Sequence, residues 1–171
     1  SIRLRLGARP VPIQMPIGAE KDFSGVVDLV RMKAIIFTVD GDGKTFEETE
    51  IPAELREEAE MRRHEMLEAA AEFDEELLDL FVEDEPVPED LVQRALRVGT
   101  LAMDITPVLA GSALKHKGVP FMLDAVVDLL PSPLDIPAIE GTVPGTEEAI
   151  TRKPQDSEPV ALMAFKTIAE V

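Results

Sequence analysis

The segment from Ile105 to Pro133, ITPVLAGSALKHKGVPFMLDAVVDLLPSP, contains the strongest structural signals in the chain. Its first six residues are mostly apolar and too few for a helix, so they predict a buried strand. GSALKHKG, residues 111–118, then predicts a polar loop between two glycines. A helix ended by Pro131 is predicted next, because apolar residues recur every three or four positions at Val119, Met122, Leu123, Val126, Val127 and Leu130.

This strand, loop and helix suggest a ligand site at the loop. In open α/β sheets, ligands bind at the carboxyl ends of strands, where backbone N–H groups are available. The backbones of Ser112, Ala113 and Leu114 are therefore candidate hydrogen-bond donors to a flat ligand that carries oxygen. The alternative is a plain connection between a strand and a helix, and the spacing alone leaves both interpretations open.

Composition excludes several classes of site. None of the 171 residues is cysteine, so the sequence excludes disulfides, thiol nucleophiles and thiolate zinc sites. No apolar run approaches the length of a membrane span, and the first residues lack the hydrophobic core of a signal peptide. We therefore expect a cytoplasmic protein without a membrane partner.

The negative charge is concentrated in one region. Of the net charge of −17, residues 47–90 hold −16, from 19 acidic residues and 3 arginines. Such a surface repels phosphate backbones, so we expect no direct DNA binding. A basic protein surface is the expected partner of this region.

The N-terminal third predicts one helix end and several strands. SIRLRLG resembles the last turns of a helix that stops at Gly7, and Ser1 is a poor helix cap, so we expect the chain to be part of a longer protein. RPVPIQMPIG, residues 9–18, predicts an edge strand because its prolines forbid a helix. Residues 23–37 contain two apolar runs, which predict two tightly joined strands, and FEETEIP predicts a further strand.

The acidic region predicts helices. From Pro52 to Phe81 the spacing indicates one long amphipathic helix, with a bend possible in it, whose apolar stripe is Leu55, Ala59, Met66, Ala70, Phe73, Leu77 and Phe81. A shorter helix is predicted over residues 89–101, with Gly99 as its stop and with Leu91, Val92, Ala95 and Leu96 facing inward. Residues 134–158 have the composition of a linker with one brief extended piece, and a strand is predicted from Pro159.

Three motif matches fail. Gly43-Lys44-Thr45 ends like a phosphate-binding loop, but Thr38 occupies the position where that motif requires a small residue. An EF-hand beginning at Asp40 would end at Ile51 where a glutamate is needed, so DGDG, residues 40–43, is predicted to be a hairpin turn. His64 lacks a second histidine four residues later, so no metalloprotease motif is present and a solvated side chain is expected.

Three stretches together resemble bacterial-type elongation factor G. They are RLGARPVPIQMPIGAEKDFSGVVDLVRMKA (5–34), LRVGTLAMDITPVLAGSALKHKGV (96–119) and LDAVVDLLPSPLDIPAIEGT (123–142). The resemblance covers nearly the whole chain, and GSALKHKGV followed by a helix ending in LPSPLDIP is highly specific to this family.

The resemblance implies an α/β fold with five parts. Residues 1–9 would end a helix of the GTPase domain, and residues 10–100 would form its inserted α+β subdomain. Residues 101–133 would supply the last strand and helix of the P-loop GTPase domain. Residues 134–158 would be a linker, and residues 159–171 would begin a second, β-barrel domain.

The resemblance also assigns a site and partners. Gly111 to Leu114 match the last guanine-recognition box, which makes Ser112, Ala113 and Leu114 guanine-binding residues of the intact protein. The family's phosphate-binding loop, switch segments, magnesium loop and NKxD box would precede Ser1, so no catalytic or metal-binding residue is assigned here. GTP or GDP and Mg²⁺ are expected only in the intact factor, and the ribosome and its stalk protein are the expected partners.

Overall fold

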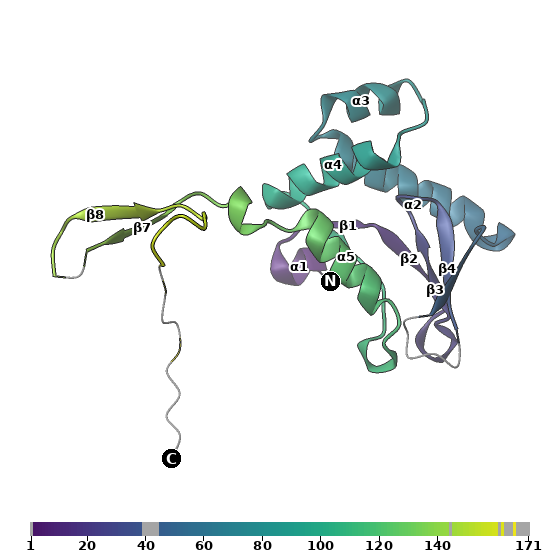
Figure 1. The fold of residues 1–171 in the computed structure, drawn as a ribbon. Helices are drawn as coiled ribbons and strands as arrows, with labels where there is room; N and C mark the ends of the chain where they lie inside the picture. The colour runs from purple at the N-terminus through teal and green to yellow at the C-terminus, as the bar shows by residue number, and fades with distance from the viewer. Residues whose placement is uncertain (1, 39–44, 144, 161, 163–165, 167–171) are drawn as a thin grey trace, which may run out of the picture. The chain divides into compact units, whose positions relative to one another are not determined.

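The computed structural model describes residues 2–38, 45–143, 145–160, 162 and 166 of the chain. These residues combine helices and strands, so the α/β fold class is confirmed. The chain separates into two compact units, residues 1–130 and residues 131–171. The first unit carries most of the secondary structure and all of the helices longer than one turn (Figure 1).

A four-stranded antiparallel sheet organises the first unit. Its strands are β2 (Gln14–Ile17), β3 (Gly25–Asp28), β4 (Lys33–Phe37) and β5 (Phe46–Thr49), paired in that order. The two strands predicted within residues 23–37 are thus confirmed as the antiparallel pair β3 and β4. The predicted strand in FEETEIP is confirmed as β5, whereas the DGDG turn before it lies outside the described residues.

Both faces of this sheet are covered, which explains the continuous apolar run in β3. Val26 and Val27 point to opposite faces and are both 0% exposed. Val27 belongs to the main core together with helix residues such as Met66 and Val92. Val26 packs with Ile35 and Phe37 in a smaller cluster that also contacts Ala110 and Phe121. A strand buried on both faces loses the alternation of apolar and polar residues that marks a half-exposed strand.

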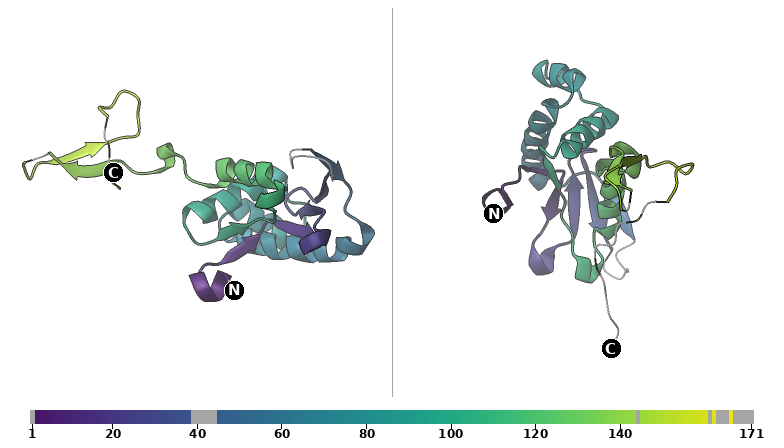
Figure 2. Two further views of the ribbon diagram at one scale, coloured as in Figure 1. Left: turned by 90° about the horizontal axis from the view of Figure 1, so that it is seen from below. Right: turned by 90° about the vertical axis from the view of Figure 1, so that its left-hand side faces the viewer.

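The helical layer differs from the prediction in one respect. The expected helix over residues 52–81 is two helices, α2 (Ala53–Ala71) and α3 (Glu75–Val82) (Figures 1 and 2). The break is stabilised by Asp74, whose carboxylate accepts the backbone N–H of Leu77 at 3.2 Å and the side chain of Arg94 at 2.8 Å. An aspartate at this position caps a new helix start, so the chain turns here although the apolar stripe continues.

The predicted stripe nevertheless faces the core. Ala59, Met66, Ala70 and Leu77 are buried, and Leu55, Phe73 and Phe81 pack against the same cluster. Arg63 also joins α2 to the sheet, because its guanidinium donates to the backbone oxygens of Leu29 at 2.6 Å and Val30 at 2.5 Å. The helical layer is therefore held to the sheet by apolar contacts and by one partly buried cation.

The third helix, α4 (Glu89–Leu101), confirms the prediction for residues 89–101 but corrects the role of Gly99. The four predicted inward positions are buried, as is Gly99. Gly99 does not stop the helix, which continues to Leu101. A Cβ atom on Gly99 would lie 2.7 Å from ring carbons of Phe73 and 2.9 Å from Ile105, so this glycine permits close packing.

The segment 9–18 also differs from the prediction. It forms two strands in two sheets, because β1 (Pro10–Pro12) pairs in parallel with β6 (Thr106–Val108) and β2 joins the larger sheet. The chain changes partner at Ile13, whose N–H donates to Val108 and whose carbonyl accepts from Leu29. The helix end before it is confirmed as α1 (Ile2–Leu6), followed by Gly7 at φ +64°.

The strand and helix of the opening segment are confirmed as β6 and α5 (Val119–Leu129), and α5 is followed by the prolines at 131 and 133. The strand, however, is not buried as predicted. Thr106 is exposed and Pro107 and Val108 are half-buried, because the strand belongs to a two-stranded sheet. In α5 only Leu129 is buried, whereas most of its predicted apolar stripe is exposed among the described residues: Met122, Leu123, Val126, Val127 and Leu130.

The second unit contains a hairpin where the sequence predicted a linker with one brief extended piece. Strands β7 (Ile139–Thr142) and β8 (Ala149–Arg152) pair antiparallel. Gly145, at φ +81°, supplies the left-handed backbone of their connection. Proline and glycine content made this segment resemble a linker, and its short strands carry too few apolar residues to show the pairing. The strand predicted from Pro159 falls largely outside the described residues.

We expect Phe73→Asp to destabilise the chain by roughly 3 kcal/mol, because a carboxylate would replace a ring packed against the core and Gly99. Thermal unfolding followed by circular dichroism should show a melting temperature about 6–12 °C lower. Leu78→Asp is the matched control, since Leu78 lies on α3 with 44% of its surface exposed. A Phe73→Asp chain that melts within about two degrees of the parent would contradict this packing.

Candidate functional site

The loop after β6 is closed by backbone hydrogen bonds at its base. Ser112 N–H donates to Lys117 O at 2.9 Å, and Lys117 N–H donates to Ser112 O at 3.1 Å. These two bonds form a small antiparallel bridge. The residues between them, 113–116, are thereby confined to a tight projection whose shape depends on the main chain rather than on its side chains.

The tip of this projection is a single turn of 3₁₀ helix, η2 (Ala113–Lys115). Lys115 N–H donates to Ser112 O, and His116 N–H donates to Ala113 O. Among the described residues, the N–H groups of Ala113 and Leu114 have no acceptor, as expected for the first residues of a helical turn. Leu114 is 91% exposed. Two neighbouring backbone donors are therefore available to a ligand.

Ser112 differs from Ala113 and Leu114 in its hydrogen bonding. Its N–H is used in the bridge to Lys117, so it is not a free donor in this structure. Its side chain makes no capping bond to the turn. Of the three predicted donors, the structure leaves Ala113 and Leu114 available, while Ser112 fixes the width of the loop.

Hydrogen bonds to residues far away in the sequence fix the position of the loop. Lys117 Nζ donates to Phe23 O at 2.7 Å and lies 5.8 Å from the centre of the Phe23 ring. Gln14 is 8% exposed, and its Oε1 accepts the N–H of Ala110 at 3.3 Å. Sequence analysis missed both anchors. The signal for Gln14 was a lone amide inside an apolar, proline-rich stretch, whereas Lys117 carried no comparable signal.

Gly118 allows the chain to enter α5 directly from the loop. Its φ of +81° lies in the left-handed region, and a Cβ atom there would approach Ala110 O to 3.0 Å. Phe121, near the start of α5, then packs against Phe37 with ring centres 6.3 Å apart. The loop is thus held from both ends by the smaller apolar cluster of the sheet.

A second candidate surface is the acidic outer face of α2. Its glutamates are exposed: Glu54, Glu57, Glu58, Glu60, Glu65 and Glu68. Few arginines offset them, although Arg62 pairs with Glu58 at 3.1 Å. At the end of the helix, the hydrogen bond from Arg9 lowers the pKa of Glu72. This face remains strongly negative at neutral pH and suits a basic partner.

The described residues form no cluster suited to a metal ion. No group of three or more histidine, aspartate or glutamate side chains among them could hold one. His64 is exposed and lies against Phe81, with ring centres 4.8 Å apart. None of the helices in the described part of the chain is both long and apolar enough to cross a membrane.

Known proteins resemble this chain over nearly all of its length. Elongation factor G from Thermotoga petrophila is 52% identical over 162 residues, which is 95% of this chain and 23% of that protein. Elongation factor G from Thermotoga maritima is 51% identical over the same shares. The resemblance to elongation factor G is confirmed. The chain therefore spans about a quarter of the length of the curated elongation factor G proteins that it matches.

Comparison of folds agrees with this result. A crystal structure of a protein from Thermus thermophilus matches with a TM-score of 0.65 and 29% identity, over 80% of this chain and 20% of that one. A search of protein-family models gave no match. The sequence relationship to elongation factor G thus comes from whole-chain similarity.

Proposed function

We propose that this chain is the part of an elongation factor G, the GTP-dependent translocase of ribosomal protein synthesis, that supplies the last guanine-recognition loop. The observation that carries the proposal is the 52% identity over 95% of the chain. We further propose that the intact factor is cytoplasmic and works on the ribosome. Within it, GTP or GDP and Mg²⁺ would be held largely by segments that this chain does not contain.

In this proposal the loop contacts the guanine oxygen through its main chain. The two free donors, the N–H groups of Ala113 and Leu114, lie at an exposed tip with a fixed base. The oxygen of a guanine base can accept such N–H groups. Each hydrogen bond of this kind contributes about 0.5–1.5 kcal/mol net. Ser112 serves the same function indirectly, by holding the loop closed.

The domain boundaries follow the same proposal. Residues 1–9 end a GTPase-domain helix, residues 10–100 form the inserted subdomain, and residues 101–133 return to the GTPase domain. Residues 134–158 connect to a second domain that begins at residue 159. The exposed apolar face of α5 supports this arrangement, since a helix inside a larger GTPase domain would cover such a face against further strands.

A second candidate function is a stand-alone module that binds the ribosomal stalk protein through the inserted subdomain. The acidic outer face of α2 favours it. NMR titration separates the two functions. The C-terminal domain of the stalk protein should shift amide signals of residues 54–82 of the chain, whereas in the intact factor a guanine nucleotide should shift amide signals near residues 111–116.

We expect the chain alone neither to hydrolyse GTP nor to bind it measurably. A micromolar complex requires about −8 kcal/mol, and even a millimolar one about −4 kcal/mol. Two backbone bonds of about 0.5–1.5 kcal/mol each fall short of this before the entropy of association is subtracted. Calorimetric titration with GDP should give no binding heat, and phosphate release should equal the buffer blank. Saturable binding tighter than about 100 μM would reveal a missed phosphate site.

In the full-length factor, we expect Ala113→Pro to weaken GDP binding about tenfold, because proline lacks the N–H that would meet the base. The loop should tolerate proline, since Ala113 is the first residue of η2 and Ser112 is extended at φ −132° and ψ 98°. Ala113→Gly is the matched control, because it keeps the N–H. Equal GDP affinity in the two variants would exclude Ala113 as a donor to the base.

Binding of the stalk protein should weaken steeply as salt is raised, because exposed charges are screened over roughly 8 Å at physiological ionic strength. Glu57→Gln/Glu65→Gln, on the acidic face of α2, should weaken binding at low salt. Glu147→Gln/Glu148→Gln removes the same charge in the second unit and should not. Calorimetry that finds equal affinity at low and high salt would show that the contact is mainly apolar and that the charge on α2 serves only solvation.

A further inference from the structure

A cavity of about 370 Å³ opens in the first unit between the sheet, α4 and α5. It is separate from the acidic face of α2, because no residue of α2 lines it. Its apolar part includes Phe46 and Phe121, whose ring centres lie 4.8 Å apart in an edge-on arrangement. Polar side chains from the sheet, α4 and α5 also line the cavity.

Gln14 presents an unused hydrogen-bond donor to the cavity. Its oxygen accepts the N–H of Ala110. This hydrogen bond identifies the other end of the side-chain amide as the nitrogen. The nitrogen has no acceptor among the described residues, although Gln14 is only 8% exposed. No fully buried side-chain nitrogen or oxygen of the described residues lacks a partner. The amide nitrogen is therefore not fully buried, and Gln14 is one of the residues that line the cavity.

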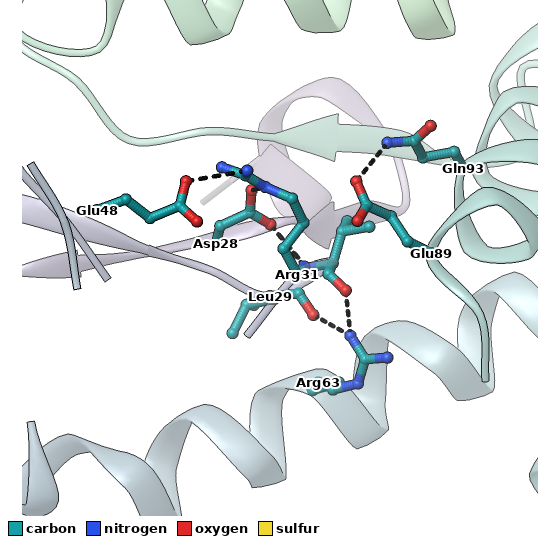
Figure 3. A network of polar contacts seen from close by, with 8 residues as sticks. Asp28, Leu29, Arg31, Glu48, Arg63, Glu89 and Gln93 are labelled. Carbon is teal, nitrogen blue, oxygen red and sulfur yellow. Dashed lines mark hydrogen bonds and ion pairs between the residues drawn. The ribbon is translucent and has the colours of Figure 1, made fainter. Parts of the chain in front are cut away.

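The walls of the cavity are strongly negative. Five carboxylates and one arginine line it. Asp28 and Glu48 share Arg31 at 3.0 Å each, and Glu89 accepts from Gln93 at 3.2 Å (Figure 3). This leaves two further carboxylates, Asp124 and Asp128, which have no ion-pair or hydrogen-bond partner among the described side chains and lie one turn apart on α5.

We propose that this cavity binds a basic peptide segment. A backbone carbonyl of the peptide accepts the free N–H of Gln14, and its arginine or lysine side chain pairs with Asp124 and Asp128. The aliphatic stem of that side chain lies against the apolar part of the cavity, as long basic side chains do elsewhere.

Other ligand classes fit less well. A phosphate group would meet an excess of four negative charges, counted from the five carboxylates and Arg31. A bare metal ion would lack a ligand cluster among the described residues. A simple diamine supplies cations but no acceptor, so it would leave the Gln14 donor unpaired. A peptide supplies both the acceptor and the cation.

NMR titration of the ¹⁵N-labelled chain with acetyl-Gly-Arg-Gly-amide tests this proposal. We expect the side-chain amide signals of Gln14 to shift together with backbone amides of α5. The same peptide with citrulline in place of arginine should bind about tenfold more weakly, because it keeps the carbonyls and loses the charge. Agmatine, which keeps the guanidinium and lacks the peptide carbonyls, should leave the Gln14 amide signals in place.

Matched double variants test whether Asp124 and Asp128 pair with the arginine of the peptide. Asp124→Asn/Asp128→Asn should weaken binding of the arginine peptide about tenfold. Glu20→Gln/Asp22→Asn removes the same charge from exposed positions that do not line the cavity, and it should leave the affinity unchanged. The proposal is overturned if both double variants weaken binding equally. It is also overturned if the peptide shifts only amides of α2 and leaves the Gln14 signals unmoved. The peptide would then be attracted non-specifically to the acidic face of α2.

Discussion

Burial of strand β3 on both faces is the constraint on which the first unit depends. Val27 faces the helical core and Val26 faces the small cluster under the loop, and neither is exposed. Full burial of two such side chains contributes roughly 1.5–3 kcal/mol each. Strand β3 therefore packs against both the helical layer and the residues that flank the loop. A change that displaced β3 would therefore move the candidate partner surface and the candidate ligand loop together.

The loop itself relies on backbone geometry more than on particular side chains. The Ser112–Lys117 bridge and the turn within it use main-chain groups. Two polar side chains, Gln14 and Lys117, act as anchors where each satisfies a backbone partner after β6 or before β3. A loop built this way keeps its donors oriented without a ligand, which limits the entropy lost on binding.

Sequence patterns predicted most elements of this fold because apolar spacing is a local property. They predicted strands β3 and β4 and helices α4 and α5. They could not show the break before α3, since Met66, Ala70, Phe73 and Leu77 keep helical spacing across it. Gly99 was misassigned because its role arises from Phe73, a neighbour in space. Gln14 and Ala110 are 96 residues apart, so no local pattern could join them.

The change of partner at Ile13 leaves no spare length between β1 and β2. One residue separates Pro12, the last residue of β1, from Gln14, the first of β2, and its own N–H and carbonyl bond to different strands. Inserting or deleting a residue here would turn every side chain of one strand to its opposite face. Either Val11 would leave the core, or Met15 and the Gln14 anchor would exchange sides. A change of length at this junction would therefore disturb both sheets, whereas an insertion in a turn would leave the register of each strand unchanged.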